Sequence, residues 1–146
     1  RKMVAHKGSA LTILFVCPEN SARSAMAAGL AQKLLDPSFR ILSAVTEASE
    51  IINPAAIEVM KELGIDISKL NPVELRKIDL ASVNIIVTLG KAATVFELTP
   101  NVNQSYWLVP DPEVGRRPYG ERLQRFREVR DILKLRMRIF AKEFHA

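Results

Sequence analysis

An uninterrupted apolar run near the N-terminus constrains the fold more than any other feature of the chain. It spans Leu11–Val16, is rich in β-branched and aromatic side chains, and therefore predicts a buried strand. The Ala- and Leu-rich run that follows, ending at Leu35, predicts a helix. The short loop between them contains Cys17, the only cysteine of the sequence, and then Arg23. The loop therefore lies where a strand gives way to a helix.

The rest of the chain continues this alternation of strand and helix. A helix begins near Asn53–Pro54 and ends by Gly64, and apolar residues at three- and four-residue steps predict an amphipathic helix over 121–146. Further strands are predicted at Arg40–Ala44, Val83–Leu89 and Tyr106–Val109. The alternation predicts an α/β fold: a single domain with a doubly wound, four-stranded parallel sheet and helices on both faces. We expect residues 11–146 to form this domain and residues 1–10 to be a flexible N-terminal segment or to derive from an expression vector.

Composition narrows the class of protein. The 146 residues suit one domain, and a hydrophobic content of 48% argues against disorder. One cysteine excludes an internal disulfide, and no apolar run reaches membrane-spanning length. His6 and His145 lie near opposite ends without a carboxylate cluster, so we expect no metal site. No secretory pattern is visible, which favours a cytoplasmic location.

The positive charge of the chain is mostly local. Residues 121–146 hold eight Lys or Arg against four Asp or Glu, which accounts for most of the net charge of +5. On an amphipathic helix these side chains form a solvated face, and no aromatic interleaving supports nucleic-acid binding. We therefore expect neither a nucleic acid nor a membrane as partner, although the positive field can attract anionic substrates.

The loop after the first strand combines three chemical functions. Its backbone N–H groups and the positive end of the following helix can converge on a tetrahedral oxyanion. The same cradle stabilises a thiolate, so we expect the pKa of Cys17 to lie below that of a free cysteine. Arg23 can grip two oxygens of the anion at once. The predicted oxyanion-binding residues are Pro18, Glu19, Asn20, Ser21, Ala22, Arg23 and Ser24.

A lone cysteine at the end of a core strand is more often an inert, buried side chain. What favours a functional cysteine here is the combination of the strand, the Cys-x5-Arg-Ser spacing from Cys17 to Ser24, and the helix. Asp111, between Pro110 and Pro112 after the last predicted strand, is a candidate proton donor. Its alternative role is that of a turn carboxylate.

Several segments together carry a family resemblance. Cys17–Ser24 resembles the signature phosphate-binding loop of the low-molecular-weight phosphotyrosine protein phosphatase superfamily, which includes related arsenate reductases. Other segments that fit are Ile52–Ile57, Gly64–Ser68, Val83–Leu89 and Trp107–Pro112. The resemblance extends from Leu11 to about Phe144.

The resemblance implies a role for each site residue. Cys17 would be the nucleophile that forms a phosphocysteine intermediate, and Arg23 would hold the oxyanion. Asp111 would protonate the leaving group and then activate water. Asn20 would brace the loop, and Ser24 would donate a hydrogen bond to the Cys17 sulfur.

Two departures from the family pattern leave the substrate open. Glu113 and Val114 occupy positions where phosphotyrosine-selective members carry aromatic residues, and the Thr46–Glu47 region has none either. Thioredoxin-coupled arsenate reductases use two further cysteines, whereas this chain has Ala22 in the loop and Gly90 after the third predicted strand.

Hydrolysis of a phosphate monoester needs one thiol, and this favours a phosphatase that requires no cofactor. Its substrate would be a phosphoprotein or another phosphate monoester. The alternative is an arsenate reductase that takes its second thiol from outside, as a small thiol or a thiol redox protein. A third possibility is a non-catalytic relative that binds phosphate, arsenate or another tetrahedral oxyanion. Glu19, where the family often has glycine, would weaken oxyanion binding if its carboxylate pointed inward.

Overall fold

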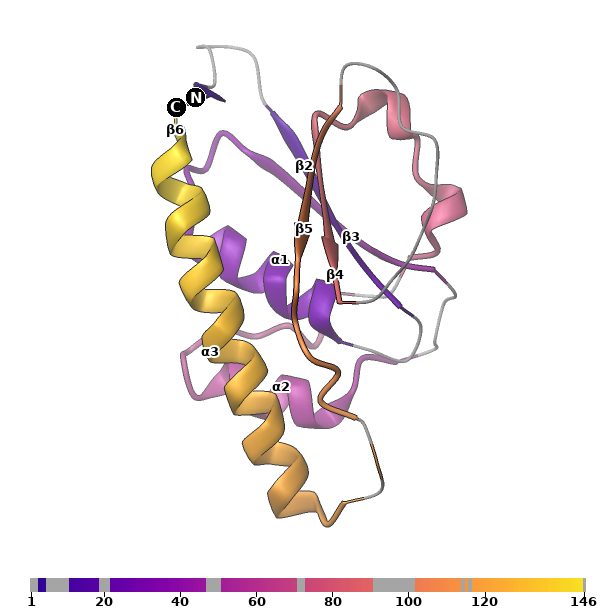
Figure 1. The fold of residues 1–146 in the computed structure, drawn as a ribbon, viewed down its shortest axis with the longest axis vertical. Helices are drawn as coiled ribbons and strands as arrows, with labels where there is room; N and C mark the ends of the chain where they lie inside the picture. The colour runs from indigo at the N-terminus through magenta and orange to yellow at the C-terminus, as the bar shows by residue number, and fades with distance from the viewer. Residues whose placement is uncertain are drawn as a thin grey trace.

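A four-stranded parallel sheet forms the centre of the molecule (Figure 1). The computed structural model describes residues 3–4, 11–18, 22–46, 51–70, 73–90, 102–113, 115 and 117–145. The sheet has the order β3-β2-β4-β5 and consists of β2 (Thr12–Cys17), β3 (Arg40–Val45), β4 (Ile85–Leu89) and β5 (Asn103–Trp107). The predicted α/β class, single domain and parallel sheet are confirmed.

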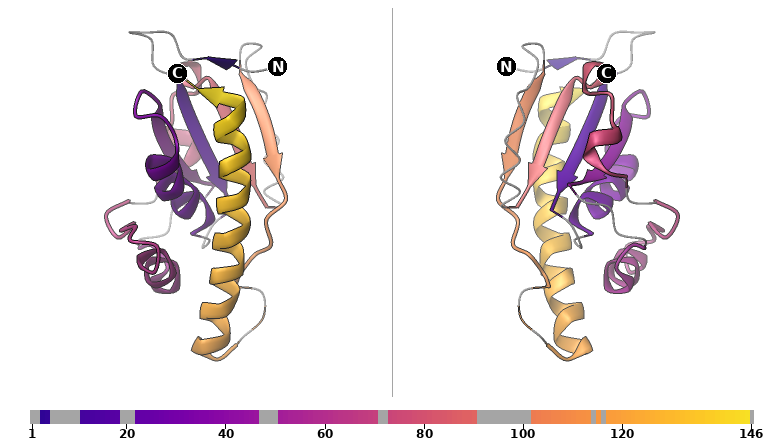
Figure 2. Two further views of the ribbon diagram at one scale, coloured as in Figure 1. Left: turned by 90° about the vertical axis from the view of Figure 1, so that its left-hand side faces the viewer. Right: turned by 90° about the vertical axis from the view of Figure 1, so that its right-hand side faces the viewer.

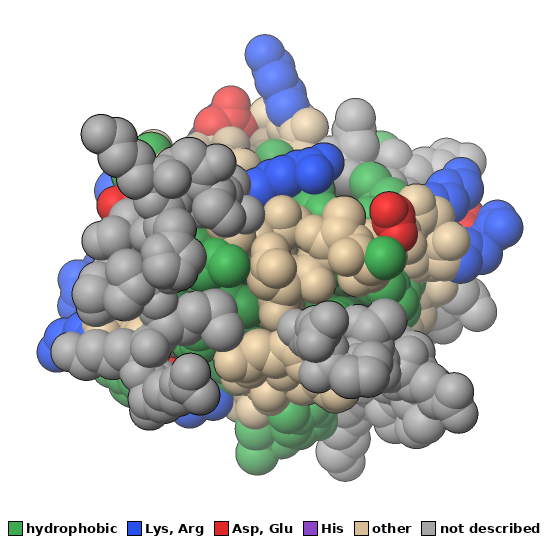
Figure 3. All heavy atoms as spheres, turned by 90° about the horizontal axis from the view of Figure 1, so that it is seen from above, with side chains coloured by type: hydrophobic (Ala, Val, Ile, Leu, Met, Phe, Trp, Pro, Cys, Tyr) green, Lys and Arg blue, Asp and Glu red, His purple; other side chains and the backbone are tan. Residues whose placement is uncertain are grey.

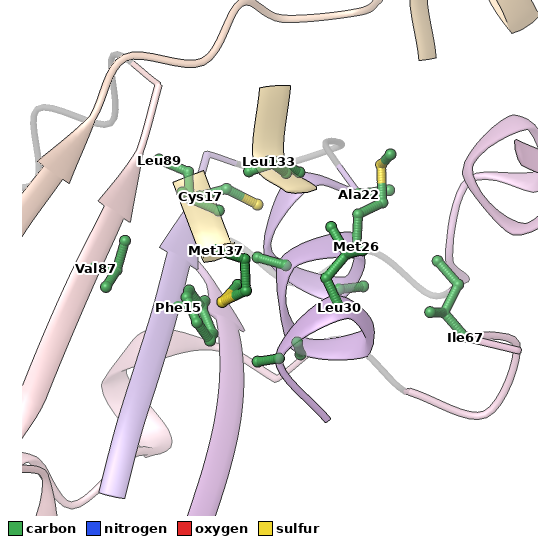
Figure 4. Close-up of a cluster of buried hydrophobic side chains, with 14 of the residues drawn as sticks. Phe15, Cys17, Ala22, Met26, Leu30, Ile67, Val87, Leu89, Leu133 and Met137 are labelled. Carbon is green, nitrogen blue, oxygen red and sulfur yellow. The ribbon is translucent and has the colours of Figure 1, made fainter. Parts of the chain in front are cut away.

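The described residues form three α-helices, of which the first and third pack against one face of this sheet while the second packs against the third (Figure 2). They are α1 (Arg23–Leu34), α2 (Pro54–Lys61) and α3 (Tyr119–Glu143). Their apolar faces form one continuous core with the side chains of β2 and β4 that point the same way, including Phe15 and Val87 (Figure 4). Among the described residues, no helix is both long and apolar enough to cross a lipid bilayer.

The second face of the sheet also carries helical elements, which among the described residues are short 3₁₀ helices. Its smaller core of Leu14, Val16 and Ile86 is covered, among the described residues, by two 3₁₀ turns. These are η1 (Leu75–Lys77) and η2 (Leu80–Ser82).

The last strand also lies earlier than predicted. The sequence predicted Tyr106–Val109, whereas β5 pairs Asn103–Trp107 with Ile85–Leu89 of β4. As an edge strand, β5 tolerates exposed polar residues at its start, so hydrophobicity alone placed it too late. Residues 108–109 therefore lie after the end of the strand, where the carbonyl of Val109 accepts a hydrogen bond from Arg23.

The two ends of the chain meet in a small parallel pair that the sequence did not predict. β1 (Met3–Val4) pairs with β6 (Phe144–His145), and the rest of residues 1–10 lies outside the described residues. Figure 3 views this end of the molecule from above, and its Lys and Arg side chains lie at separate places around the rim.

A network of charged side chains fixes α2 against α3. Arg127 and Arg130 of α3 both donate to the carboxylate of Glu62, which follows α2, and these bonds lower the pKa of Glu62 to about 2. Arg130 Nη1 also donates to the carbonyl of Val59, at 2.9 Å. The two helices are thereby held together.

Candidate active site

Cys17 is the last residue of β2, at the carboxyl edge of the sheet. It pairs in register with Val45 of β3, and its carbonyl accepts from the amide of Thr46 at 3.2 Å. Figure 4 shows Cys17 beside Leu89, at the end of β4, and Leu133 of α3. In open α/β sheets, ligands bind outside the carboxyl ends of the strands, where neighbouring connections diverge. The connections from β2 and β4 leave the sheet at this edge.

The Cys17 sulfur is buried and hydrogen bonded to the first turn of α1. The Ser24 amide donates to Sγ at 3.3 Å, and the thiol donates to Ser24 Oγ at 3.2 Å. When the thiol ionises, the Ser24 hydroxyl can rotate and donate to the sulfur instead. Donors directed at sulfur and the positive helix end both favour a thiolate. Ser24 therefore contacts the sulfur with its amide as donor and its hydroxyl as acceptor, and donation by the hydroxyl, which the resemblance implies, stays a prediction for the thiolate.

The N-terminus of α1 carries no side-chain cap, because Ala22 stands at the N-cap position and no acidic residue occupies the first turn. Such a helix end is suited to an oxyanion. Glu19, Asn20 and Ser21 lie outside the described residues, so their part in the cradle stays a prediction.

Arg23 extends from the start of α1 towards the segment that follows β5. Its side chain is buried, and Nη1 donates to the carbonyl of Val109 at 2.6 Å. This bond joins parts of the chain 86 residues apart. It places the segment carrying Asp111 against the arginine that is predicted to hold the anion.

Gly90, immediately after β4, makes room for the Arg23 guanidinium. Its φ of +72° favours glycine, and a Cβ at this position would lie 2.0 Å from Arg23 Nη1. Any side chain at position 90 is thus incompatible with this placement of Arg23. The sequence identified Gly90 only as a position without the expected cysteine and gave no sign of its contact with Arg23.

We expect Gly90→Ala to impair oxyanion binding by displacing Arg23. Gly64→Ala is the matched control, since Gly64 has a φ of +73° but nothing within 4 Å of the added Cβ. Both variants incur about 1 kcal/mol of backbone strain. Only Gly90→Ala should weaken phosphate binding, by about tenfold or more, because it also disturbs a charged hydrogen-bond donor. Calorimetric titration with phosphate and thermal unfolding measure the two effects, and equal phosphate affinities would contradict this role of Gly90.

Asp111 lies exposed on the segment after β5. Its Oδ1 accepts from the Glu113 amide at 2.9 Å, which forms the kind of turn expected of a structural aspartate between prolines. The turn does not exclude proton transfer, because the segment that carries Asp111 follows the carboxyl end of β5, and Cys17 lies at the carboxyl end of β2 in the same parallel sheet. The Arg23–Val109 bond is two residues from Asp111.

Glu113 stands where phosphotyrosine-selective members carry an aromatic residue, and here its carboxylate makes hydrogen bonds of its own. Its Oε1 accepts from Asn53 Nδ2 at 2.7 Å and from Arg122 Nη2 at 2.9 Å. Sequence reasoning missed Arg122 entirely and treated Glu113 only as a lost aromatic. No short-range pattern connects Asn53, Glu113 and Arg122, because they come from three distant segments.

Comparison with known proteins now identifies the family. The profile of the low molecular weight phosphotyrosine protein phosphatase family matches residues 12–146. The chain belongs to this family. The resemblance in its loop and strands is thereby confirmed.

Its relatives include several arsenate reductases. An arsenate reductase of Halalkalibacterium halodurans is 38% identical over 132 residues, covering 89% of this chain and 94% of the relative. A solved arsenate reductase in its oxidized state superposes with a TM-score of 0.76 at 26% identity, covering 90% of this chain and 96% of that one. Another, in a phosphate binding state, gives a TM-score of 0.73 at 29% identity, with 90% and 97% covered. The chain therefore belongs to a family of enzymes and is similar to arsenate reductases over nearly its whole length.

Proposed function

We propose that the protein is an arsenate reductase in which Cys17 attacks arsenate and the second thiol comes from another molecule. The similarity to arsenate reductases over nine-tenths of the chain carries this proposal. It reverses the preference for a phosphatase drawn from the number of thiols alone. The buried, hydrogen-bonded sulfur of Cys17 and the Arg23 clamp are suited to an arsenate ion, which has the shape and charge of phosphate.

The first step forms a bond between Cys17 Sγ and arsenic. The bond between arsenic and one arsenate hydroxyl group breaks, and Asp111 donates a proton to that hydroxyl so that it leaves as water. Arg23 and the N-terminus of α1 hold the remaining oxygens while their charge changes. Arsenic is still As(V) after this step.

The external thiol completes the reduction. Its thiolate attacks Cys17 Sγ, the S–As bond breaks with its electron pair going to arsenic, and arsenite is released as As(III). Cys17 is left in a mixed disulfide, which a second donor thiol cleaves to restore the Cys17 thiolate. Two donor thiols are thus oxidised to one disulfide for each arsenate reduced.

The environment of Gly90 supports an external donor. A relay cysteine at this position would collide with Arg23, so the anion clamp and a thiol at residue 90 compete for the same space. The chain carries no cysteine other than Cys17.

Phosphate monoester hydrolysis is the second candidate, favoured by the same single cysteine. Cys17 would attack phosphorus and form a phosphocysteine, Asp111 would protonate the leaving alkoxide or phenoxide, and water would release phosphate. This route consumes no thiol. The two candidates therefore differ in a quantity that can be measured.

Parallel assays of the purified chain test the proposal. One contains arsenate with a small monothiol or with a reduced dithiol redox protein, and the other contains an aryl phosphate without thiol. We expect arsenite to form only when a donor is present, with one donor disulfide per arsenite. Rapid phosphate release with no arsenite from either donor would overturn the proposal in favour of the phosphatase.

Asp111→Asn should slow arsenate reduction without weakening oxyanion binding. The amide cannot donate the proton that the departing hydroxide needs, so we expect turnover to fall by about 10²- to 10³-fold. Asp36→Asn is the matched control. Asp36 accepts from the Ser38 amide at 2.9 Å in a similar turn, and it is distant from Asp111 in the sequence. Turnover and phosphate affinity are measured for both. If Asp111→Asn retained wild-type turnover, Asp111 would be a turn residue only.

A further inference from the structure

Glu113 lies at the junction of the Asp111 segment, α2 and α3. Its amide donates to Asp111 Oδ1 at 2.9 Å, while its carboxylate accepts from Asn53 at 2.7 Å and from Arg122 at 2.9 Å. The backbone of Glu113 therefore binds the candidate acid Asp111, and the side chain of Glu113 binds α2 and α3.

Both partners of the Glu113 carboxylate are fixed by their own helices. Asn53 caps α2, because its Oδ1 accepts from the Ala55 amide at 2.9 Å. Arg122 belongs to the first turns of α3 and lies over the ring of Tyr119, at 5.7 Å from the ring centroid. The Tyr119 hydroxyl in turn donates to Glu58 of α2, at 2.8 Å. Glu113 is thus anchored to rigid elements on two sides.

The segment carrying Asp111 is held at both ends. Arg23 binds the carbonyl of Val109 on one side, and Asn53 and Arg122 bind Glu113 on the other. Between these anchors lie only Pro110, Asp111 and Pro112. The rings of the two prolines restrict the backbone on either side of Asp111. The direction of the Asp111 carboxylate therefore depends on the two anchors.

We propose that Glu113 is a positioning residue whose anchored side chain directs the Asp111 carboxylate for proton donation. The inference rests on the proposed function for its substrate, arsenate. It needs only that Asp111 protonates a leaving oxygen, which phosphate ester hydrolysis requires as well.

A purely structural ion pair would behave differently. Glu113 and Arg122 keep about 30% of their side-chain surfaces exposed, and such pairs add little to stability. The Arg122 Nε is buried and, among the described residues, has no partner, so loss of Glu113 would leave this guanidinium poorly satisfied and free to shift. The effect on proton transfer should therefore exceed the effect on stability.

A double-mutant cycle tests the proposal. Glu113→Gln is made in the wild-type chain and in the Asp111→Asn variant, with Glu128→Gln, an exposed position on α3, as the control for charge. We expect Glu113→Gln to lower kcat for arsenate about tenfold with KM nearly unchanged, since the carboxylate is aimed less well. In the Asp111→Asn background it should have no further effect. Arg122→Gln, which removes the same ion pair from the other side, should show the same dependence on Asp111.

Hydrogen exchange supplies a readout that does not depend on turnover. The residue 113 amide should exchange faster in Glu113→Gln than in the wild type or in Glu128→Gln. Unchanged kcat, or an equal loss with and without Asp111, would overturn the positioning role. If the wild type forms no arsenite but hydrolyses an aryl phosphate, the proposed function fails, and the same cycle measured on the ester decides the role of Glu113. A chain that turns over neither substrate overturns both proposals.

Discussion

Cys17→Ser abolishes turnover while the fold and oxyanion binding persist: this is the largest effect that we expect. A serine hydroxyl is not ionised at neutral pH and cannot replace the thiolate as nucleophile. The loss should be on the order of 10⁵-fold or more, as when the nucleophile of a hydrolase is removed. The hydroxyl can keep hydrogen bonds to the Ser24 amide and hydroxyl, so packing changes little.

Arsenite formation, phosphate titration and thermal unfolding of Cys17→Ser are measured together. We expect a phosphate affinity near that of the wild type, because the anion contacts that we propose come from Arg23 and backbone amides and do not involve the sulfur. Residual turnover within tenfold of the wild type would show that Cys17 is a core residue and that the chemistry lies elsewhere.

The second large effect is expected for Arg23→Lys. Lysine keeps the positive charge but lacks the planar fork, so it cannot donate to Val109 and grip two oxyanion atoms in one geometry. We expect both phosphate affinity and turnover to fall by about 100-fold, comparable to the loss of one strong transition-state donor.

Arg130→Lys is the matched control for this substitution. Arg130 is also a buried arginine that donates to a backbone carbonyl, that of Val59, but it lies between α2 and α3. Its substitution should lower the unfolding temperature and leave phosphate affinity unchanged. If Arg23→Lys showed only the same loss of stability, with normal anion binding, Arg23 would serve the fold and not the substrate.

The sequence predicted the parts of the fold that depend on local pattern. The apolar runs that became β2 and β4, the Asn53–Pro54 start of α2 and the long amphipathic α3 all carry local signals of hydrophobic period or capping. β5 was placed too late because its first residues are polar, and an edge strand is set by its pairing with β4. The pair of β1 with β6 joins the two ends of the chain and has no local signal.

The contacts of the candidate site also divide into those that the sequence indicated and those that it did not. Cys17 ends β2 and Ser24 lies in the first turn of α1, close together in the sequence, and the family resemblance implied a contact between them. The bond from Arg23 to Val109 and the close approach of Arg23 to Gly90 depend on how β4 and β5 align, which no motif encodes. Glu113 illustrates the same limit, because its partners come from the start of α2 and the start of α3.

The central claim is that arsenate is reduced through Cys17 and an external thiol. It is tested most directly by measuring the mass of the chain during a single turnover. The reduced protein is mixed with arsenate and one equivalent of a small monothiol, quenched in acid and digested for mass spectrometry. We expect Cys17 to carry the donor as a mixed disulfide, with arsenite released in equal amount, and we expect no such adduct when phosphate replaces arsenate. Arsenite release with Cys17 unmodified at every time point, or a phosphorylated Cys17 from an aryl phosphate with no arsenate-dependent adduct, would contradict reduction through this thiol.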